Sequence, residues 1–571
     1  MVEYNGAGNP VTHKQKLLQH HSQLTTDRAS WISHWQECGQ HFMPRAARFY
    51  ATDRNKGDKR HNNIIDNAGI RANRVLGAGM MSGATSPARP WFRVSHPDKD
   101  LMEFSPVKEW MADVQQMLLG VFARANTYPM LHTLYEELGV FGTHAVIGYD
   151  DFDKVIYHYN SPTGEFCLDV DYRGNTNTLT REFERTVGQL VGEFGLNNCS
   201  TTVRNLYANG NYNAPVKVLH VIEPRTERDT RKRDRKNKPW ASCYIEIGSE
   251  EARTSNLYLR ESGFDTFPVL APRWHKVGND VYGQSPAMDA LGDSKQLQHL
   301  SLRKANAVDY QTKPPIQLPT AARGQEQNFL PGGVSFFDAP DNRNSARTLW
   351  DVNLNLQHLR EDIMDTRQRI ESAMYSDLFL MLANADKNNM TATEVAERHE
   401  EKLVQLGPVL ERLHNELLAP LVENTFARCV AVGMVPTPPK ELQNQPLQVE
   451  FISTLAQAQR AIGVNSIDRF VANLGAIAQF KPDVLDKFDQ DKWADSYSDM
   501  MGIDPEMIVS NERVALARNA RAQQAAAAQK AEQAAVEAKA AQSLGSVKTD
   551  SPNLATDMLN QVQGYSSPIS Q

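Results

Sequence analysis

The strongest constraint on the fold is a change in hydrophobic period along the chain. Apolar residues recur at helical spacing through most of the sequence. Between Gly142 and Arg181 they instead fall into short β-branched and aromatic runs separated by Gly, Pro and Asp, and three more such runs follow at about 216–223, 241–248 and 256–262. The pattern predicts an α+β protein that is mainly helical and has small β-layers. A chain of 571 residues has room for several domains.

Long helices are expected on both sides of the predicted strands. We expect them over about 11–42, 64–83, 105–124, 129–140, 285–312, 352–383 and 391–433. A pair of short helices is expected over about 184–208. Residues 511–544 are rich in Ala, Gln, Glu and Lys, so this segment is a strong helix former with little to bury by itself.

A glycine-rich stretch, LGAGMMSG, begins at Leu76. A dinucleotide-binding loop needs glycines spaced G-x-G-x-x-G between a strand and a helix. Here Gly77, Gly79 and Gly83 have another spacing and follow a predicted helix. We therefore interpret them as sites of close helix packing and as a helix C-cap.

The sequence offers no recognisable catalytic, metal-binding or cofactor-binding pattern. It lacks a P-loop, an H-E-x-x-H pair and a G-x-S-x-G turn. The five cysteines are scattered, which indicates reduced thiols in a cytosol. Neither a signal peptide nor an apolar run of about 18 residues is present, so we expect no membrane segment. The residues alone therefore give no catalytic group, cofactor or metal to expect, and they lead no further than a large α+β protein.

One short segment is strongly basic although the chain is acidic, with a formal net charge of −7. Between Arg225 and Lys238 there are eight Lys or Arg residues and three acids. The run lies between two predicted strands, so we expect a long hairpin loop. The acidic balance argues against binding nucleic acid over the whole surface, so any such contact is expected to be local.

Four stretches together resemble the portal proteins of short-tailed bacteriophages, also called head-to-tail connecting proteins. They are SPARPWFRV, VYGQSPAMDALGDSKQLQHLSLRKANA, NNMTATEVAERHEEKL and LAPLVENTFARCVAVGMVP. They follow one another in the family's order from about residue 60 to about residue 440. The basic run and the Ala-rich C-terminus are not part of the shared pattern.

The resemblance implies a cyclic ring of identical subunits, most often twelve, at one vertex of the capsid. A terminase packaging motor docks on such a ring and drives double-stranded DNA inward through its channel. Tail adaptor proteins later replace the motor, and the DNA leaves by the same path. The expected partners are further copies of this chain, DNA, motor, adaptor and capsid proteins, with no membrane. The expected locations are the virion and, during assembly, the host cytoplasm.

The resemblance also implies a division into wing, stem, clip and crown. The implied parts are a wing at 1–185 and 313–383, stem helices at 186–209 and 285–312, a clip at 210–284, a tunnel loop at 384–391 and crown-side helices at 392–505. Outside the shared pattern, we expect residues 506–571 to form an Ala-rich helical barrel or crown extension with a tail, or else a flexible tail. In the resembling proteins the tunnel loop is the narrowest point of the channel. Lys387 would give it a positive ring, with Asn388 and Asn389 as neutral neighbours.

The basic run has two interpretations under this resemblance. In the first, the interleaved acids make it a solvated loop with internal salt bridges. In the second, it is a docking surface for acidic patches on motor or adaptor, with contact to exiting DNA as a lesser option. The cations of that surface are Arg228, Arg231, Lys232, Arg233, Arg235 and Lys236.

Two other classes of protein stay open. A nucleic-acid-processing enzyme could carry a carboxylate cluster that the sequence does not reveal. A capsid scaffolding protein would suit the Ala-rich helix, although such proteins are usually mostly helical, which disagrees with the β-rich middle.

Overall fold

The computed structural model describes most of the chain in two compact units, Met1–Gly463 and Val464–Gln571. The described residues are 12–46, 64–98, 104–254, 257–319, 330–337, 356–384, 405–442 and 511–545, with a few near 49–60, at 101–102, 347–348 and 447–452, and within 470–509. Helices and several sheets are mixed, so the predicted α+β class is confirmed.

A five-stranded antiparallel sheet is the largest of the sheets among the described residues of the first unit. Its strands, in spatial order, are β4 (Phe166–Val170), β5 (Thr176–Thr186), β6 (Pro215–Pro224), β7 (Trp240–Glu246) and β8 (Arg260–Phe264). Four of these strands were expected, but the expected β-rich segment ended at Arg181 and the helical pair began near 184. The chain instead stays extended to Thr186, because residues 179–186 of β5 pair with residues 215–222 of β6. The sheet therefore includes strands from residues 1–185, which were predicted as wing, and from residues 210–284, which were predicted as clip.

Helices cover both faces of this sheet. On one face lies α1 (His13–Asp27), whose Leu17 packs with Leu219 and Val221 of β6. On the other lie α7 (Val187–Phe194) and α8 (Thr201–Ala208), and Leu190 of α7 packs with Val218. Side chains alternate across a strand, so one strand supplies both apolar faces.

The main hydrophobic core of the first unit is formed by side chains of a second sheet and of four helices, among other elements. The sheet is β3 (Val155–Ser161), β2 (Ala145–Asp151) and β9 (Val269–Leu270), and the helices are α2 (Ala29–Phe42), α3 (Ala68–Ala84), α5 (Ser105–Arg124) and α6 (Thr127–Phe141). A distant pair, β1 (Phe92–Ser95) and β13 (Gln448–Phe451), joins the same core. Because Val269, Leu270 and Trp274 belong to this core, residues 269–274 are part of the body of the unit.

The glycines of α3 allow close helix packing, as predicted. A Cβ at Gly77 would lie 2.6 Å from Cγ of Glu136 in α6, and one at Gly79 would lie 2.2 Å from the ring of Phe379. Phe379 belongs to α13 (Ser376–Asn384). The predicted glycine C-cap is wrong, because α3 ends at Ala84 and its C-cap residue is Thr85.

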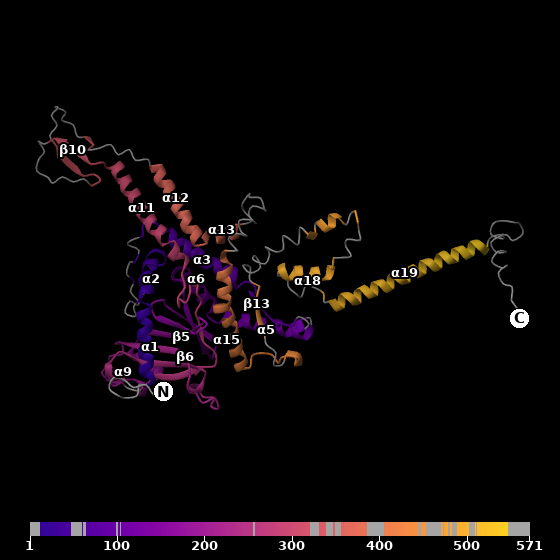
Figure 1. Ribbon diagram of the computed structural model, residues 1–571, viewed down its shortest axis with the longest axis horizontal. Helices are drawn as coiled ribbons and strands as arrows, with labels where there is room; N and C mark the ends of the chain where they lie inside the picture. The colour runs from indigo at the N-terminus through magenta and orange to yellow at the C-terminus, as the bar shows by residue number, and fades with distance from the viewer. Residues whose placement is uncertain are drawn as a thin grey trace. The chain divides into compact units, whose positions relative to one another are not determined.

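Two long helices extend side by side from the body and carry a small sheet at their far end (Figure 1). They are α11 (Leu291–Thr312), preceded by the short α10 (Pro286–Asp289), and α12 (Leu356–Ala373). The sheet has the order β11 (Val334–Phe337), β10 (Ile316–Pro319) and β12 (Arg347–Thr348). We call α11, α12 and these strands the arm.

The helix expected over 352–383 is broken after α12. Tyr375 takes a left-handed φ of +53°, and α13 begins at the next residue. The hydroxyl of Ser376 donates to the carbonyl of Glu371 at 3.0 Å, which satisfies one acceptor at the end of α12. Met374 is fully buried at the break, so packing against the core overrides the helical periodicity.

A buried ion pair ties the C-terminal helices of this unit to the segment after β9. Residues 414–418 form a π-helical turn just before α15 (Ala419–Val432), near whose start Pro420 lacks an N–H. In that turn Glu416 accepts from the backbone N–H of Arg273 at 2.9 Å and from its Nε at 3.1 Å. Nη2 of Arg273 also donates to the Gly174 carbonyl at 3.0 Å. The Arg273 side chain is 2% exposed, so its charge depends on these acceptors.

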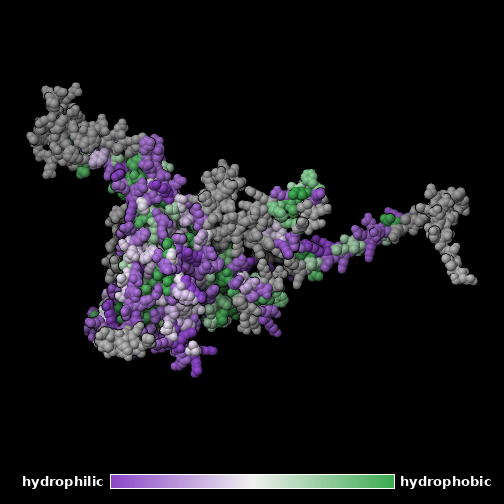
Figure 2. All heavy atoms as spheres, viewed as in Figure 1, coloured by the Kyte–Doolittle hydropathy of each residue, from purple (hydrophilic) through white to green (hydrophobic). Residues whose placement is uncertain are grey.

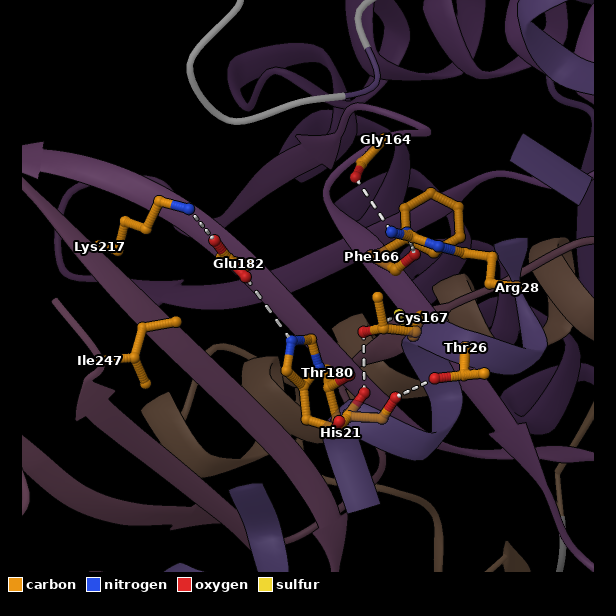
Figure 3. A network of polar contacts seen from close by, with 12 residues as sticks. His21, Thr26, Arg28, Gly164, Phe166, Cys167, Thr180, Glu182, Lys217 and Ile247 are labelled. Atoms are coloured by element: carbon orange, nitrogen blue, oxygen red, sulfur yellow. Dashed lines mark hydrogen bonds and ion pairs between the residues drawn. The ribbon is translucent and has the colours of Figure 1, made fainter. Parts of the chain in front are cut away.

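A polar network fastens α1 to the five-stranded sheet (Figure 3). Nδ1 of His21 lies 2.8 Å from the Thr180 hydroxyl and its Nε2 lies 3.9 Å from Glu182, which pairs with Lys217 at 2.9 Å. Burial lowers the pKa of His21, but contacts with Cys167 and Glu182 outweigh it and raise that pKa to about 9. The neighbouring His21, together with Lys217, lowers the pKa of Glu182 to about 2, against the effect of burial.

The second unit contains α18 (Gln490–Met501) and α19 (Asn511–Gly545). The Ala-rich helix predicted over 511–544 is confirmed. Arg518 of α19 forms a two-bond ion pair with Asp491 of α18, at 2.6 and 2.7 Å. Apart from the half-buried Val514, the described side chains of α19 are exposed, including Leu516 and Val536, which are 68% and 62% exposed.

Replacing Glu416 with Ala should lower the free energy of unfolding by about 3–5 kcal/mol, because Arg273 is then buried without its counter-ion. Glu411→Ala, which removes an exposed acid from the preceding helical residues, should change it by less than about 0.5 kcal/mol. Urea unfolding followed by tryptophan fluorescence measures both. Equal effects of the two substitutions would contradict the role of the buried pair.

The His21 network should make stability depend on pH. The folded pKa of His21, about 9, lies above its ordinary 6.5, so its contribution is complete below pH 6.5 and is lost as pH rises through 9. The contribution of Glu182 is present above pH 4.5 and is lost as pH falls through about 2. Between pH 4.5 and pH 6.5 the free energy of unfolding of the wild type should therefore be larger than that of His21→Gln by on the order of 2–3 kcal/mol. This difference should shrink as the pH rises toward 9.

Urea unfolding at a series of pH values measures this difference. His299→Gln is the matched control, because His299 is exposed on α11. If wild type and His21→Gln differ in unfolding free energy by the same amount at pH 6 and pH 9, the raised pKa of His21 is contradicted.

Candidate functional site

The basic run forms a loop between β6 and β7, as the sequence predicted. Pro224 and Trp240 face each other at the end of the strand ladder, and the backbone N–H of Arg225 donates to the Pro239 carbonyl at 2.8 Å. We call residues 225–239 the basic loop. β6, whose last residue Pro224 precedes the loop, lies at the end of the first unit opposite β10 (Figure 1).

Polar contacts within the basic loop fix its backbone. Oδ1 of Asn237 accepts from the backbone N–H of Asp229 at 2.9 Å, and its Nδ2 donates to Asp234 at 2.6 Å. A carboxylate oxygen of Asp229 accepts from the backbone N–H of Arg231 at 3.1 Å. A one-turn 3₁₀ helix over Arg235–Asn237 completes the turn. Asn and Asp stabilise turns through such bonds to the backbone.

Two acids on the β8 side hold the base of the loop. Glu261 pairs with Arg225 at 3.0 Å and with Lys236 at 3.5 Å. Asp265 pairs with Lys238. These partners lie more than 20 residues away in sequence, so charge counting within the run could not find them.

The loop's own acids neutralise little of its charge. Asp229 pairs with Lys232 at 3.8 Å, while in the contacts of the described residues Glu227 and Asp234 pair with no cation of the loop. Arg228, Arg231, Arg233 and Arg235 are exposed and make no ion pair within the part of the chain that the structure describes. The predicted solvated loop with internal salt bridges is therefore supported for one pair only.

The loop and Asp265 enclose a shallow hollow of about 600 Å³. Its lining is Arg228, Thr230, Lys232, Arg233, Asn237, Lys238, Pro239 and Asp265. Four cations and one carboxylate give this lining a formal charge of +3. Strongly hydrophilic residues cover this end of the unit (Figure 2). The hollow can hold a small anionic group, because its lining is mostly polar and supplies N–H and O–H donors.

The other predicted site lies outside the described residues. Lys387, Asn388 and Asn389 of the tunnel loop fall between the end of α13 at Asn384 and the helical residues that resume at 405. The described ranges contain no group of three or more His, Cys, Asp or Glu side chains placed to hold a metal ion. No helix in those ranges is both long enough and apolar enough to cross a membrane.

Comparison with known proteins gives the family. The profile described as bacteriophage head to tail connecting protein matches residues 14–509. The chain belongs to this family. The resemblance seen in four sequence stretches is thereby confirmed.

Two members of the head-to-tail connecting family align over almost their whole length. The probable portal protein of Bordetella phage BPP-1 is 54% identical over 554 residues, which cover 97% of this chain and 99% of that protein. The portal protein of Salmonella phage epsilon15 is 44% identical over 550 residues, which cover 96% and 98%. A solved chain from the virion of a native gene transfer agent particle covers 76% of this chain and 99% of its own length at 12% identity, with a TM-score of 0.29.

Proposed function

We propose that this chain is the portal of a bacteriophage, a ring-shaped connector at one capsid vertex through which double-stranded DNA is packaged and ejected. The observation that carries this proposal is the 54% and 44% identity to two phage portal proteins over nearly the full chain. Its expected location is the virion, after assembly in the host cytoplasm.

The working form of the protein is a closed ring of most often twelve copies. Cyclic symmetry closes a ring when each subunit presents two different, complementary surfaces to its neighbours. The terminase motor supplies the energy for packaging, while the portal itself catalyses no reaction. Motor and tail adaptor dock on the ring in turn, and capsid proteins surround it.

The arm is a better candidate for the stem and clip than residues 186–209 and 210–284. Its two helices, α11 and α12, contain 22 and 18 residues and run together away from the body. By contrast, α7 and α8 have eight residues each and pack on the five-stranded sheet. We therefore assign the stem to α11 and α12 and the clip to about residues 313–355, so that motor and adaptor dock at β10–β12.

The exposed surface of α19 supports its assignment to a barrel or crown extension. A long helix with a low apolar content gains little stability alone, whereas its Ala side chains allow close packing between neighbouring copies. Leu516 and Val536 would be covered in such an assembly.

Negative-stain images of the purified protein test the proposed function. We expect rings with a central hole. Only monomers at high protein concentration would contradict the proposal. A protein that forms no ring and cleaves plain duplex DNA with a metal ion would favour an enzyme, and one that is absent from mature particles would favour a scaffold.

Substitution of Lys387, the only cation in the sequence of residues 384–391, tests the proposed role of the tunnel loop. A ring of lysines touches passing phosphates without the many contacts that would stall DNA. Lys387→Glu should leave rings intact but lower the amount of DNA packaged or retained, and Lys387→Ala should do so mildly. Lys440→Glu makes the same change of charge at an exposed lysine elsewhere. Packaging by Lys387→Glu that equals that of the Lys440 control would remove Lys387 from the mechanism.

A further inference from the structure

The basic loop has no role in the assignment above. It lies at the end of the first unit opposite β10, whereas motor and adaptor are assigned to the β10–β12 end. It is nevertheless a local concentration of positive charge on an acidic chain. Its exposed arginines have no counter-ions within the described residues, so a negatively charged partner can reach them.

The chemistry of the loop favours phosphate over a protein partner. Stable protein interfaces depend on aromatic or aliphatic side chains buried at their centre. From Arg225 to Lys238 the loop contains no such side chain, and Trp240 at its end packs against Phe267 with ring centroids 4.6 Å apart. A nucleic acid backbone needs no apolar anchor, because binding to phosphates releases counterions.

The loop also favours a duplex over a single strand. Proteins that bind single strands stack the bases on aromatic side chains. The basic loop offers none, so it can contact the backbone but cannot hold unstacked bases. Contacts to phosphate alone carry no sequence information, and any such binding is independent of sequence.

The backbone of the loop is already fixed, so binding a phosphate costs little conformational entropy. Asn237 and Asp229 fix the turn, and the ion pairs of Glu261 and Asp265 hold its base. Arginine donates two parallel hydrogen bonds to one phosphate. Arg228 and Arg233 both line the hollow, so both are available to a phosphate that enters it.

We propose that the basic loop is a docking site for the phosphate backbone of duplex DNA outside the channel. This inference deepens the proposed function, because it assumes a portal that meets DNA and names the DNA contact of this surface. Each loop holds a small number of phosphates, and the ring repeats the site in every subunit. Binding is therefore non-specific and weakens steeply with salt.

A covalently closed duplex minicircle labelled with a fluorophore tests the proposal on the assembled ring. Such a circle cannot thread through a closed ring, so its binding reports surfaces outside the channel. The loop variant carries Arg→Gln at 228, 231, 233 and 235, whose side chains make no ion pair within the described residues. The matched control removes the same charge from exposed α19 positions, by Arg513→Gln, Arg521→Gln, Lys530→Gln and Lys539→Gln.

Wild type and control should bind the minicircle, and the loop variant should bind at least about tenfold more weakly at 0.1 M salt. Its slope of log K against log salt should be less negative by about 0.9 for each phosphate that the variant no longer neutralises. Negative-stain images of each variant verify that rings form. If the loop variant assembles poorly, Arg228→Gln with Arg233→Gln repeats the test at the two arginines that line the hollow.

Equal binding by wild type and loop variant would overturn the proposal. So would an equal weakening in the α19 control, because net charge alone would then explain it. A labelled poly-glutamate peptide that binds wild type but not the loop variant, with no binding of the minicircle, would assign the loop to an acidic protein instead. In each of these cases intact rings would leave the proposed portal function standing.

Discussion

A buried arginine with a carboxylate partner joins segments that lie 143 residues apart. Arg273 follows β9, and Glu416 lies in the π-helical turn before α15. Burying the Arg273 guanidinium at 2% exposure without a partner would cost free energy. The fold must therefore bring the turn before α15 against the segment after β9. The pairing of β1 with β13 is a second contact between segments distant in sequence, because it places Phe92 beside Phe451. The body that carries both the arm and the basic loop is therefore closed by contacts between its two ends.

Local sequence predicted the elements well where their period was clear. The helices over 105–124 and 511–544 and the strand at Ala145 were found near their predicted places. It missed the end of β5 because Glu182, Glu184 and Arg185 make that strand polar, while its pairing with β6 fixes it. It missed the break at Tyr375 and the short strands β9, β12 and β13, because these depend on partners distant in sequence.

The candidate site was predicted in part. A dense run of charge between two β-rich stretches was enough to place a hairpin loop and its cations. The tethers Glu261 and Asp265 and the hollow depend on how β8 lies beside β7, which the run does not encode. The division into stem and clip stays a prediction, and the arm is proposed in place of residues 210–284 because part of that range shares a sheet with Thr176–Thr186. The tunnel loop stays a prediction from the sequence.

The central claim is that copies of this chain form a ring in which the arm, and not residues 210–284, makes the docking end. An electron cryo-microscopy map of the assembled ring tests it most directly. The claim predicts that α11 and α12 surround the channel, that β10–β12 form one end of the ring, and that the basic loop lies away from that end. A map with β6–β8 at the docking end and the arm on the outer wall would contradict it.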